Sequence, residues 1–205
     1  MVATFQQATD MGLDRREGMI DPIFWFFLFW LPSYFKDVFQ MDMTKPSVPL
    51  LVIYLSATIG SIGGGVISSK LVNKGWSALS ARKASLMVFA FLELSIILTQ
   101  YADNVWLVVF LMSIAVAVHQ AWATNIFTMA SDLFPKEVVG SVTGIAGMAG
   151  SVGGILFPLL IGYLLDTWQK AGSITTGYNI LFTGCGFAYL TALLIIHLLT
   201  RRVSS

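Results

Sequence analysis

Six long apolar runs, each close to the length of a membrane-spanning helix, constrain this chain more than any other feature. They cover approximately residues 22–40, 47–69, 84–102, 104–131, 139–165 and 178–199. A helix that crosses the ~30 Å hydrocarbon core of a bilayer needs about 20 mostly apolar residues. Charged residues make up 11% of the chain, well below the share in soluble proteins. The sequence therefore predicts an all-α integral membrane protein with six transmembrane helices.

The polar ends and the net charge of the chain narrow the class of protein further. Residues 1–20 lack the basic-then-apolar order of a signal peptide, so we expect a cytoplasmic leader or the remainder of a central loop. Residues 21–202 form the expected six-helix unit, and residues 203–205 form a cytoplasmic tail. A net charge of +1 gives no reason to expect a nucleic-acid partner. The single Cys185 excludes an internal disulfide, and the His and Cys pattern predicts neither a metal site nor a cofactor.

Lysine and arginine fall mainly on one side of the predicted membrane. Cytoplasmic loops carry an excess of both residues, so their distribution predicts orientation. With the N-terminus inside, the cytoplasmic set is Arg15, Arg16, Lys70, Lys74, Arg82, Lys83, Lys136, Arg201 and Arg202. The outer set is only Lys36, Lys45 and Lys170. We therefore expect a multi-pass protein of the inner cell membrane with both termini cytoplasmic.

Proline and glycine occur inside the predicted helices, at positions that affect helix bending and helix packing. Pro32 and Pro158 lie inside the first and fifth runs, where proline removes a backbone hydrogen bond and bends a helix. Each bend serves either transport or packing. Three glycine pairs have the small-xxx-small spacing that lets helix backbones approach closely: Gly60/Gly64, Gly140/Gly144 and Gly150/Gly154. A sliding interface and tight static packing both fit this spacing.

Polar residues interrupt the fourth apolar run in the segment HQAWATNIF, which begins at His119. His119, Trp122 and Asn125 are spaced by three and share one helix face, whereas Gln120 and Thr124 share another. His119 lies roughly 18 Å from the cytoplasmic end at 1.5 Å per residue, close to the middle of the bilayer. The spacing leaves open which face lines a cavity and which bonds to neighbouring helices.

Three longer stretches resemble one family of transporters. They are DPIFWFFLFWLPSYF at 21–35, GGGVISSKLVNKGWSALSARK at 63–83 and HQAWATNIFTMASDLFPKEVVGSVTGIAGMAGSVGGILFPLLIGYLLD at 119–166. Residues 21–202 are thereby similar to the C-terminal six-helix half of a major facilitator superfamily transporter. Within that superfamily they resemble the hexuronate transporters of the anion:cation symporter branch. The resemblance implies a 3+3 inverted repeat of helices, which is half of a twelve-helix fold.

This resemblance implies a secondary transporter and not an enzyme. The expected activity is proton-coupled uptake of a sugar acid, such as galacturonate or glucuronate, by alternating access. Such a transporter holds its substrate between two six-helix halves, and the N-terminal half is missing from this chain. We therefore expect a truncated or split protein. Its expected partners are the anionic sugar acid, the proton, the lipid bilayer, and the missing half or a second copy of the chain.

A sugar acid requires hydrogen-bond partners for its hydroxyl groups and a flat apolar surface for its C–H face. Ser151 on the fifth helix lies at a depth similar to that of the polar fourth-helix residues. The predicted substrate-binding residues are His119, Gln120, Trp122, Asn125 and Ser151, with Trp30, Tyr34 and Tyr54 closing the other side. The alternative is that these groups only join helices by hydrogen bonds.

Charged residues in and beside the spans give two further candidates. Glu93 lies inside the third span, where a carboxyl group is either a proton-coupling site or a protonated group bonded to a neighbouring helix. The basic loop at 70–83 predicts a conformational latch, in which a cation of the loop pairs with an acidic helix end. The candidates are Lys70, Arg82, Lys83 and Asp132. The alternative is positive charge that only sets topology.

Two other classes of protein compete with the transporter. A six-helix channel or structural subunit would show no coupled, saturable transport. An intramembrane protease would need His119 to activate Ser151, but the segment AGSVG around Ser151 lacks the elements of a serine nucleophile. We therefore expect no enzymatic activity.

Overall fold

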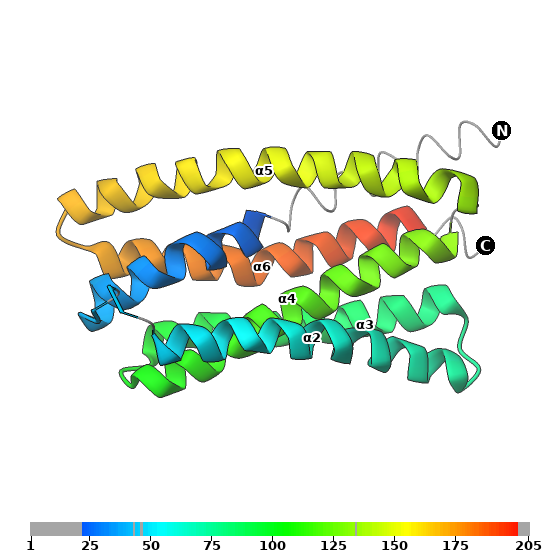
Figure 1. The fold of residues 1–205 in the computed structure, drawn as a ribbon, viewed down its shortest axis with the longest axis horizontal. Helices are drawn as coiled ribbons and strands as arrows, with labels where there is room; N and C mark the ends of the chain where they lie inside the picture. Colours follow the sequence, from blue (N-terminus) through cyan, green and yellow to red (C-terminus); the bar gives the residue numbers. More distant parts are fainter. Residues whose placement is uncertain (1–21, 43, 46, 134, 201–205) are drawn as a thin grey trace.

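The protein is a bundle of long helices in a computed structural model that describes residues 22–42, 44–45, 47–133 and 135–200 (Figure 1). Residues 22–39 form the first helix. The others are α2 (Val48–Asn73), α3 (Ala78–Glu93), its 3₁₀ continuation η1 (Leu94–Tyr101), α4 (Val105–Leu133), α5 (Lys136–Lys170) and α6 (Ile174–Thr200). No strand occurs among the described residues. The fold is all-α, as predicted.

The outer surface of the bundle suits a bilayer. Five helical segments, from α2 through α6 with α3 and η1 taken as one, are long and apolar enough to cross a membrane. Ile59, Phe91 and Leu159 are more than half exposed, which costs little where lipid replaces water. In Figure 1 successive helices run back and forth, so residues 40–42 and 171–173 lie at one end and residues 74–77 at the other. The chain is a multi-pass α-helical membrane protein.

The helices extend further into the connections than the apolar runs predicted. α3 begins at Ala78 instead of residue 84, and Ser77 caps it by accepting the backbone N–H of Ser80 (3.3 Å). The prediction of a loop over 70–83 is therefore wrong, because only residues 74–77 lie between the two helices. Hydropathy marks where a helix meets hydrocarbon, and the backbone hydrogen bonds continue beyond that point into polar turns.

α2 and α4 approach so closely that two positions of α2 require glycine. A Cβ added at Gly60 would lie 1.9 Å from the carbonyl oxygen of Ala117, and one added at Gly64 would lie 2.5 Å from Ala121 Cα. This is the close backbone approach predicted for the Gly60/Gly64 pair. The contact fixes α2 along the length of α4 and so determines which polar side chains of α4 are covered.

Pro32 stays inside the first helix, and a neighbouring side chain replaces the hydrogen bond that it removes. Proline has no N–H, so the carbonyl of Leu28, four residues earlier, loses its backbone donor. Tyr54 of α2 donates its hydroxyl to the carbonyl oxygens of Leu28 (3.1 Å) and Phe27 (3.3 Å). Proline is tolerated within a membrane where neighbours satisfy the freed carbonyl in this way.

Candidate functional site

The face of α4 that carries His119, Trp122 and Asn125 is buried in the helix bundle. These residues are 3%, 2% and 0% exposed. His119 Nδ1 forms a hydrogen bond with the hydroxyl of Tyr189 on α6 (2.5 Å). The imidazole ring also stacks on Phe24 of the first helix, with 5.1 Å between centroids. His119 thus joins three helices at the level of the polar segment.

The other two residues of this face also contact neighbouring helices. Trp122 meets the ring of Tyr189 edge-on, with centroids 5.2 Å apart. Asn125 Nδ2 donates to the carbonyl oxygens of Gly64 on α2 (3.0 Å) and Ala121 on α4 (2.9 Å). Asn125 Oδ1 is buried and accepts no hydrogen bond within the described part of the chain. Its amide therefore joins α2 to α4 in the way that polar residues join membrane helices.

The second polar face of α4 keeps one side chain free of such contacts. Thr124 Oγ1 shares a hydrogen bond with Ser61 of α2 (3.2 Å) and donates to the carbonyl of Gln120 (2.9 Å). The side chain of Gln120 is half-buried and forms no hydrogen bond with any described residue. An amide has two donor hydrogens and an acceptor oxygen. Gln120 therefore has a whole side-chain amide with unused hydrogen-bonding capacity.

Ser151 contributes no contact to the buried cluster around His119. It lies on an exposed part of α5, where its hydroxyl donates to the carbonyl of Gly147 on the same helix (2.8 Å). The structure thus shows no hydrogen bond between Ser151 and His119, the pair that a serine nucleophile would need.

The three aromatic residues of the predicted binding site all contact neighbouring helices. Tyr34 is 4% exposed and lies among aromatic rings, 5.0 Å from the centroids of both Tyr178 and Phe182. Tyr54 satisfies the carbonyl freed by proline. Trp30 packs against α5, and its indole nitrogen is buried with no acceptor among the described residues.

Glu93 ends α3 and is fully buried directly before the chain tightens into η1. Both oxygens of its carboxyl group lack a hydrogen-bond partner among the residues described. The predicted hydrogen bond between Glu93 and a neighbouring helix is therefore not present among the described residues. η1 is 8 residues long, although 3₁₀ runs beyond three or four residues are uncommon and often mark a hinge or strain. An unpartnered carboxyl group at such a junction keeps the proton-coupling hypothesis open.

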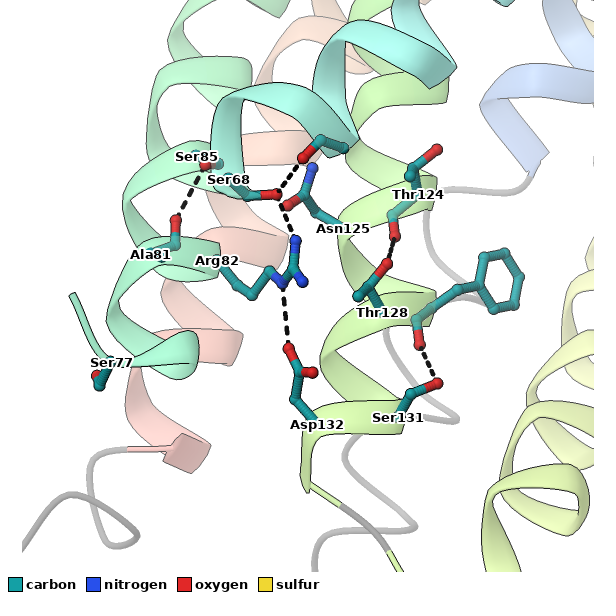
Figure 2. A network of polar contacts seen from close by, with 12 residues as sticks. Ser68, Ser77, Ala81, Arg82, Ser85, Thr124, Asn125, Thr128, Ser131 and Asp132 are labelled. Carbon is teal, nitrogen blue, oxygen red and sulfur yellow. Dashed lines mark hydrogen bonds and ion pairs between the residues drawn. The ribbon is translucent and has the colours of Figure 1, made fainter. Parts of the chain in front are cut away.

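A polar network at the end of the bundle that carries residues 74–77 connects three helices (Figure 2). Arg82 of α3 lies 3.2 Å from Asp132 of α4, measured from Nε to Oδ2. Arg82 Nη1 also donates to Ser68 Oγ of α2, and Ser68 in turn donates to the carbonyl oxygens of Gly64 and Gly65 (3.2 Å each). Arg82 is 8% exposed, so this is a largely buried cation with defined partners.

The other two cations of the predicted latch have different surroundings. Lys70 is exposed near the end of α2 and forms no ion pair with the described residues. Lys83 follows Arg82 on α3 and lines a groove between α3 and α6.

Two residues that contact His119, Phe24 and Tyr189, were not predicted from the sequence. Both are aromatic residues inside apolar runs, so their composition carries no signal of a polar contact. The only hint is that a buried tyrosine hydroxyl needs a partner, and the partner of Tyr189 is 70 residues away along the chain.

Polar contacts between the helices of the bundle gather at two levels. No group of three or more His, Cys, Asp or Glu side chains within the described ranges could hold a metal ion. Polar side chains instead gather at mid-bundle on α4 and at one end around Arg82. Both sets link helices that are distant in the sequence.

Comparison with known proteins identifies the family. Residues 20–158, more than half of the chain, match the Major Facilitator Superfamily, and the chain belongs to this family. It is 33% identical over 175 residues to the probable galactarate/D-glucarate transporter GarP of Escherichia coli strain K12, which is 85% of this chain and 38% of that protein.

Two further relatives match a similar portion. The probable galactarate/D-glucarate transporter GudP of Bacillus subtilis strain 168 is 30% identical over 156 residues, 76% of this chain and 34% of that protein. The D-galactonate transporter of Escherichia coli O6:H1 is 30% identical over 150 residues, 73% of this chain and 35% of that protein. The chain thus spans little more than a third of the length of these curated relatives.

Proposed function

We propose that this chain forms one six-helix half of a secondary transporter that takes up a sugar acid by alternating access. Membership of the Major Facilitator Superfamily and the names of the relatives support this class of activity. The names refer to two aldarates and an aldonate, so six-carbon aldarates and aldonates join galacturonate and glucuronate as candidate substrates. We place the protein in the inner membrane with both termini cytoplasmic, as the charge distribution predicts.

The observation that carries the proposal is the free amide of Gln120 on a helix segment whose neighbouring polar side chains bond to other helices. His119, Thr124 and Asn125 are all hydrogen-bonded to other helices. Gln120 is half-buried near the middle of α4, with donors and an acceptor unused by the described residues. A sugar acid presents several hydroxyl groups that need such partners, and transporters of this plan bind substrate near the bilayer midplane. We assign substrate contact to Gln120, whereas His119 and Trp122 lie on the buried face of the same helix.

Coupling and gating are assigned to the two charged sites. Glu93 is the candidate for proton coupling, because a carboxyl group buried in a membrane without a partner is costly unless it serves a function. The pair of Arg82 and Asp132 is the candidate latch, which closes one end of this half and opens when the transporter changes conformation. The coupling ion is proposed to be the proton.

We propose that the partner of this half is a second six-helix unit, either an N-terminal half or another copy of the chain. Part of α5 offers a surface for it: a Cβ added at Gly140, Gly144 or Gly147 would meet nothing within 4 Å. Apolar side chains of the same helix, such as Met148 and Ile155, are more than half exposed. Small residues beside exposed apolar ones allow another helix to pack closely.

Uptake into proteoliposomes tests the proposal. The chain is reconstituted alone and together with the N-terminal half of GarP, with labelled galactarate, galactonate or galacturonate outside and a proton gradient directed inward. We expect saturable, gradient-driven uptake of at least one substrate in the combined sample. Gln120→Ala should lower uptake about tenfold or more, the loss expected for an amide that binds a substrate hydroxyl. Gln169→Ala, at the exposed end of α5, is the matched control and should leave uptake unchanged.

The alternative function is a six-helix channel or structural subunit without coupled transport. A non-saturable flux that ignores the proton gradient would favour the channel. No flux in the combined sample, together with no effect of Gln120→Ala on substrate binding, would remove the support for a transporter half.

A further inference from the structure

A groove on the outer surface of the bundle lies between α3 and α6, apart from the polar site on α4. It has a volume of 570 Å³. Its walls are mostly apolar, and its polar side chains are Ser80 and Lys83 near the start of α3 and His197 near the end of α6. The apolar lining is Ala84, Met87, Leu190, Leu193, Leu194 and Ile196. One end of the groove is thus cationic and hydrogen-bonding, and the rest is hydrocarbon.

The polar residues of the groove lie toward one end of the bundle, and its apolar residues extend away from that end. The start of α3 and the end of α6 lie at the same end of the molecule (Figure 1). Met87 and Leu194, which line the groove further from that end, are 49% and 58% exposed. The exposed apolar surface continues along the same two segments through Leu98 on η1 and Phe187 on α6. The apolar wall of the groove is therefore flanked by further exposed apolar side chains, and its polar groups lie toward one end of the bundle.

The polar end favours an anion. Lys83 supplies a positive charge, and Ser80 and His197 supply hydrogen-bond donors. Ser80 lies in the first turn of α3, where the helix dipole also favours negative charge. Basic pockets between membrane helices on the cytoplasmic side are suited to lipid head groups.

We propose that this groove is a binding site for an anionic phospholipid of the cytoplasmic leaflet. The phosphate group lies against Lys83, Ser80 and His197, and an acyl chain follows the apolar wall past Met87 and Leu194. Charge complementarity at one end and the apolar wall at the other argue for this occupant over a soluble anion, which would leave the wall exposed.

Native mass spectrometry of the purified full chain tests the site. The protein is equilibrated in detergent micelles with equal amounts of phosphatidylglycerol and phosphatidylcholine, which share acyl chains and differ in head-group charge. We expect the protein to retain phosphatidylglycerol about fivefold more than phosphatidylcholine, as one lysine–lipid contact predicts. The double variant Lys83→Gln/His197→Gln should reduce this preference to about one to one.

Matched variants separate the groove from general surface charge. Lys70→Gln/Lys74→Gln removes two exposed lysines at the same end of the bundle but outside the groove, and should keep the preference. Leu194→Trp fills the groove without changing charge and should reduce retention of both lipids. The proposal is overturned if the Lys70/Lys74 variant loses the preference equally, or if Lys83→Gln/His197→Gln keeps it. If Lys83→Gln/His197→Gln fails to fold, unchanged retention in Leu194→Trp is the result that rejects the site.

Discussion

Arg82 Nε lies 3.2 Å from Asp132 Oδ2, so an ion pair joins the start of α3 to the end of α4 across 50 residues of sequence. The Arg82 side chain is 9% exposed and that of Asp132 is 30% exposed. A pair with one buried partner loses more on disruption than a surface pair, because the buried cation is left without its counter-charge.

Asp132→Asn should therefore lower the free energy of unfolding by about 1–3 kcal/mol, between the values for exposed and buried pairs. Unfolding of the purified protein in mixed micelles, followed by circular dichroism, measures the change. Arg82→Gln should cost a similar amount, and the double variant should cost less than the sum of the two. Strict additivity would show that the two side chains do not interact.

Asp132→Asn also tests whether the ion pair is a conformational latch. If the pair closes one end of the bundle, Asp132→Asn should increase hydrogen–deuterium exchange in residues 64–85, where α2 and α3 meet it. Lys70→Gln, which removes an exposed cation that pairs with no described residue, is the control and should leave exchange as it was. Equal exchange in wild type and Asp132→Asn would leave the pair as a static contact and reject the latch.

Gly60→Ala should destabilise the protein, because the added Cβ would lie 1.9 Å from the carbonyl oxygen of Ala117. Backbone cannot move aside as a flexible side chain does, so α2 and α4 must separate. We expect a cost of about 1–3 kcal/mol, the range for overpacking. Gly63→Ala is the matched control, since a Cβ there meets nothing within 4 Å. It should be neutral or stabilising, because alanine has the higher helix propensity.

Tyr54→Phe should cost about 1–2 kcal/mol, because it leaves the carbonyl of Leu28 without a donor. Pro32→Ala restores a backbone N–H that can bond to that carbonyl. In the Pro32→Ala background, Tyr54→Phe should therefore cost almost nothing. Thermal unfolding of the wild type, the two single variants and the double variant measures the cost of Tyr54→Phe with and without the proline. An undiminished cost of Tyr54→Phe without the proline would mean that the hydroxyl serves another partner.

Glu93→Gln should abolish uptake driven by a proton gradient while it preserves exchange of labelled for unlabelled substrate. Exchange needs binding and conformational change but no net proton movement, so a coupling carboxyl group affects the two assays differently. The control is Glu137→Gln, an exposed carboxylate in the first turn of α5. Loss of both activities would indicate a structural role for Glu93, and retention of both would exclude it from coupling.

Local features of the sequence predicted much of the fold. The lengths of the apolar runs predicted helices that span a membrane, because each run must shield its own backbone from hydrocarbon. The spacing of His119, Trp122 and Asn125 correctly predicted a shared face, since helical periodicity is set by the backbone alone. Helix ends were predicted less well: α3 starts six residues before the apolar run, because a capped polar turn has no hydropathy signal.

The sequence by itself determined that the chain is helical, membrane-spanning and polar at the middle of α4. Only the tertiary structure decided that His119 bonds to Tyr189, that Asn125 bonds to Gly64, and that the amide of Gln120 bonds to no described residue. The physical reason is that a polar side chain has the same appearance in a sequence whether its partner is a substrate or another helix. Close packing of α2 against α4 selects which polar groups are covered, and that packing depends on contacts some 60 residues apart.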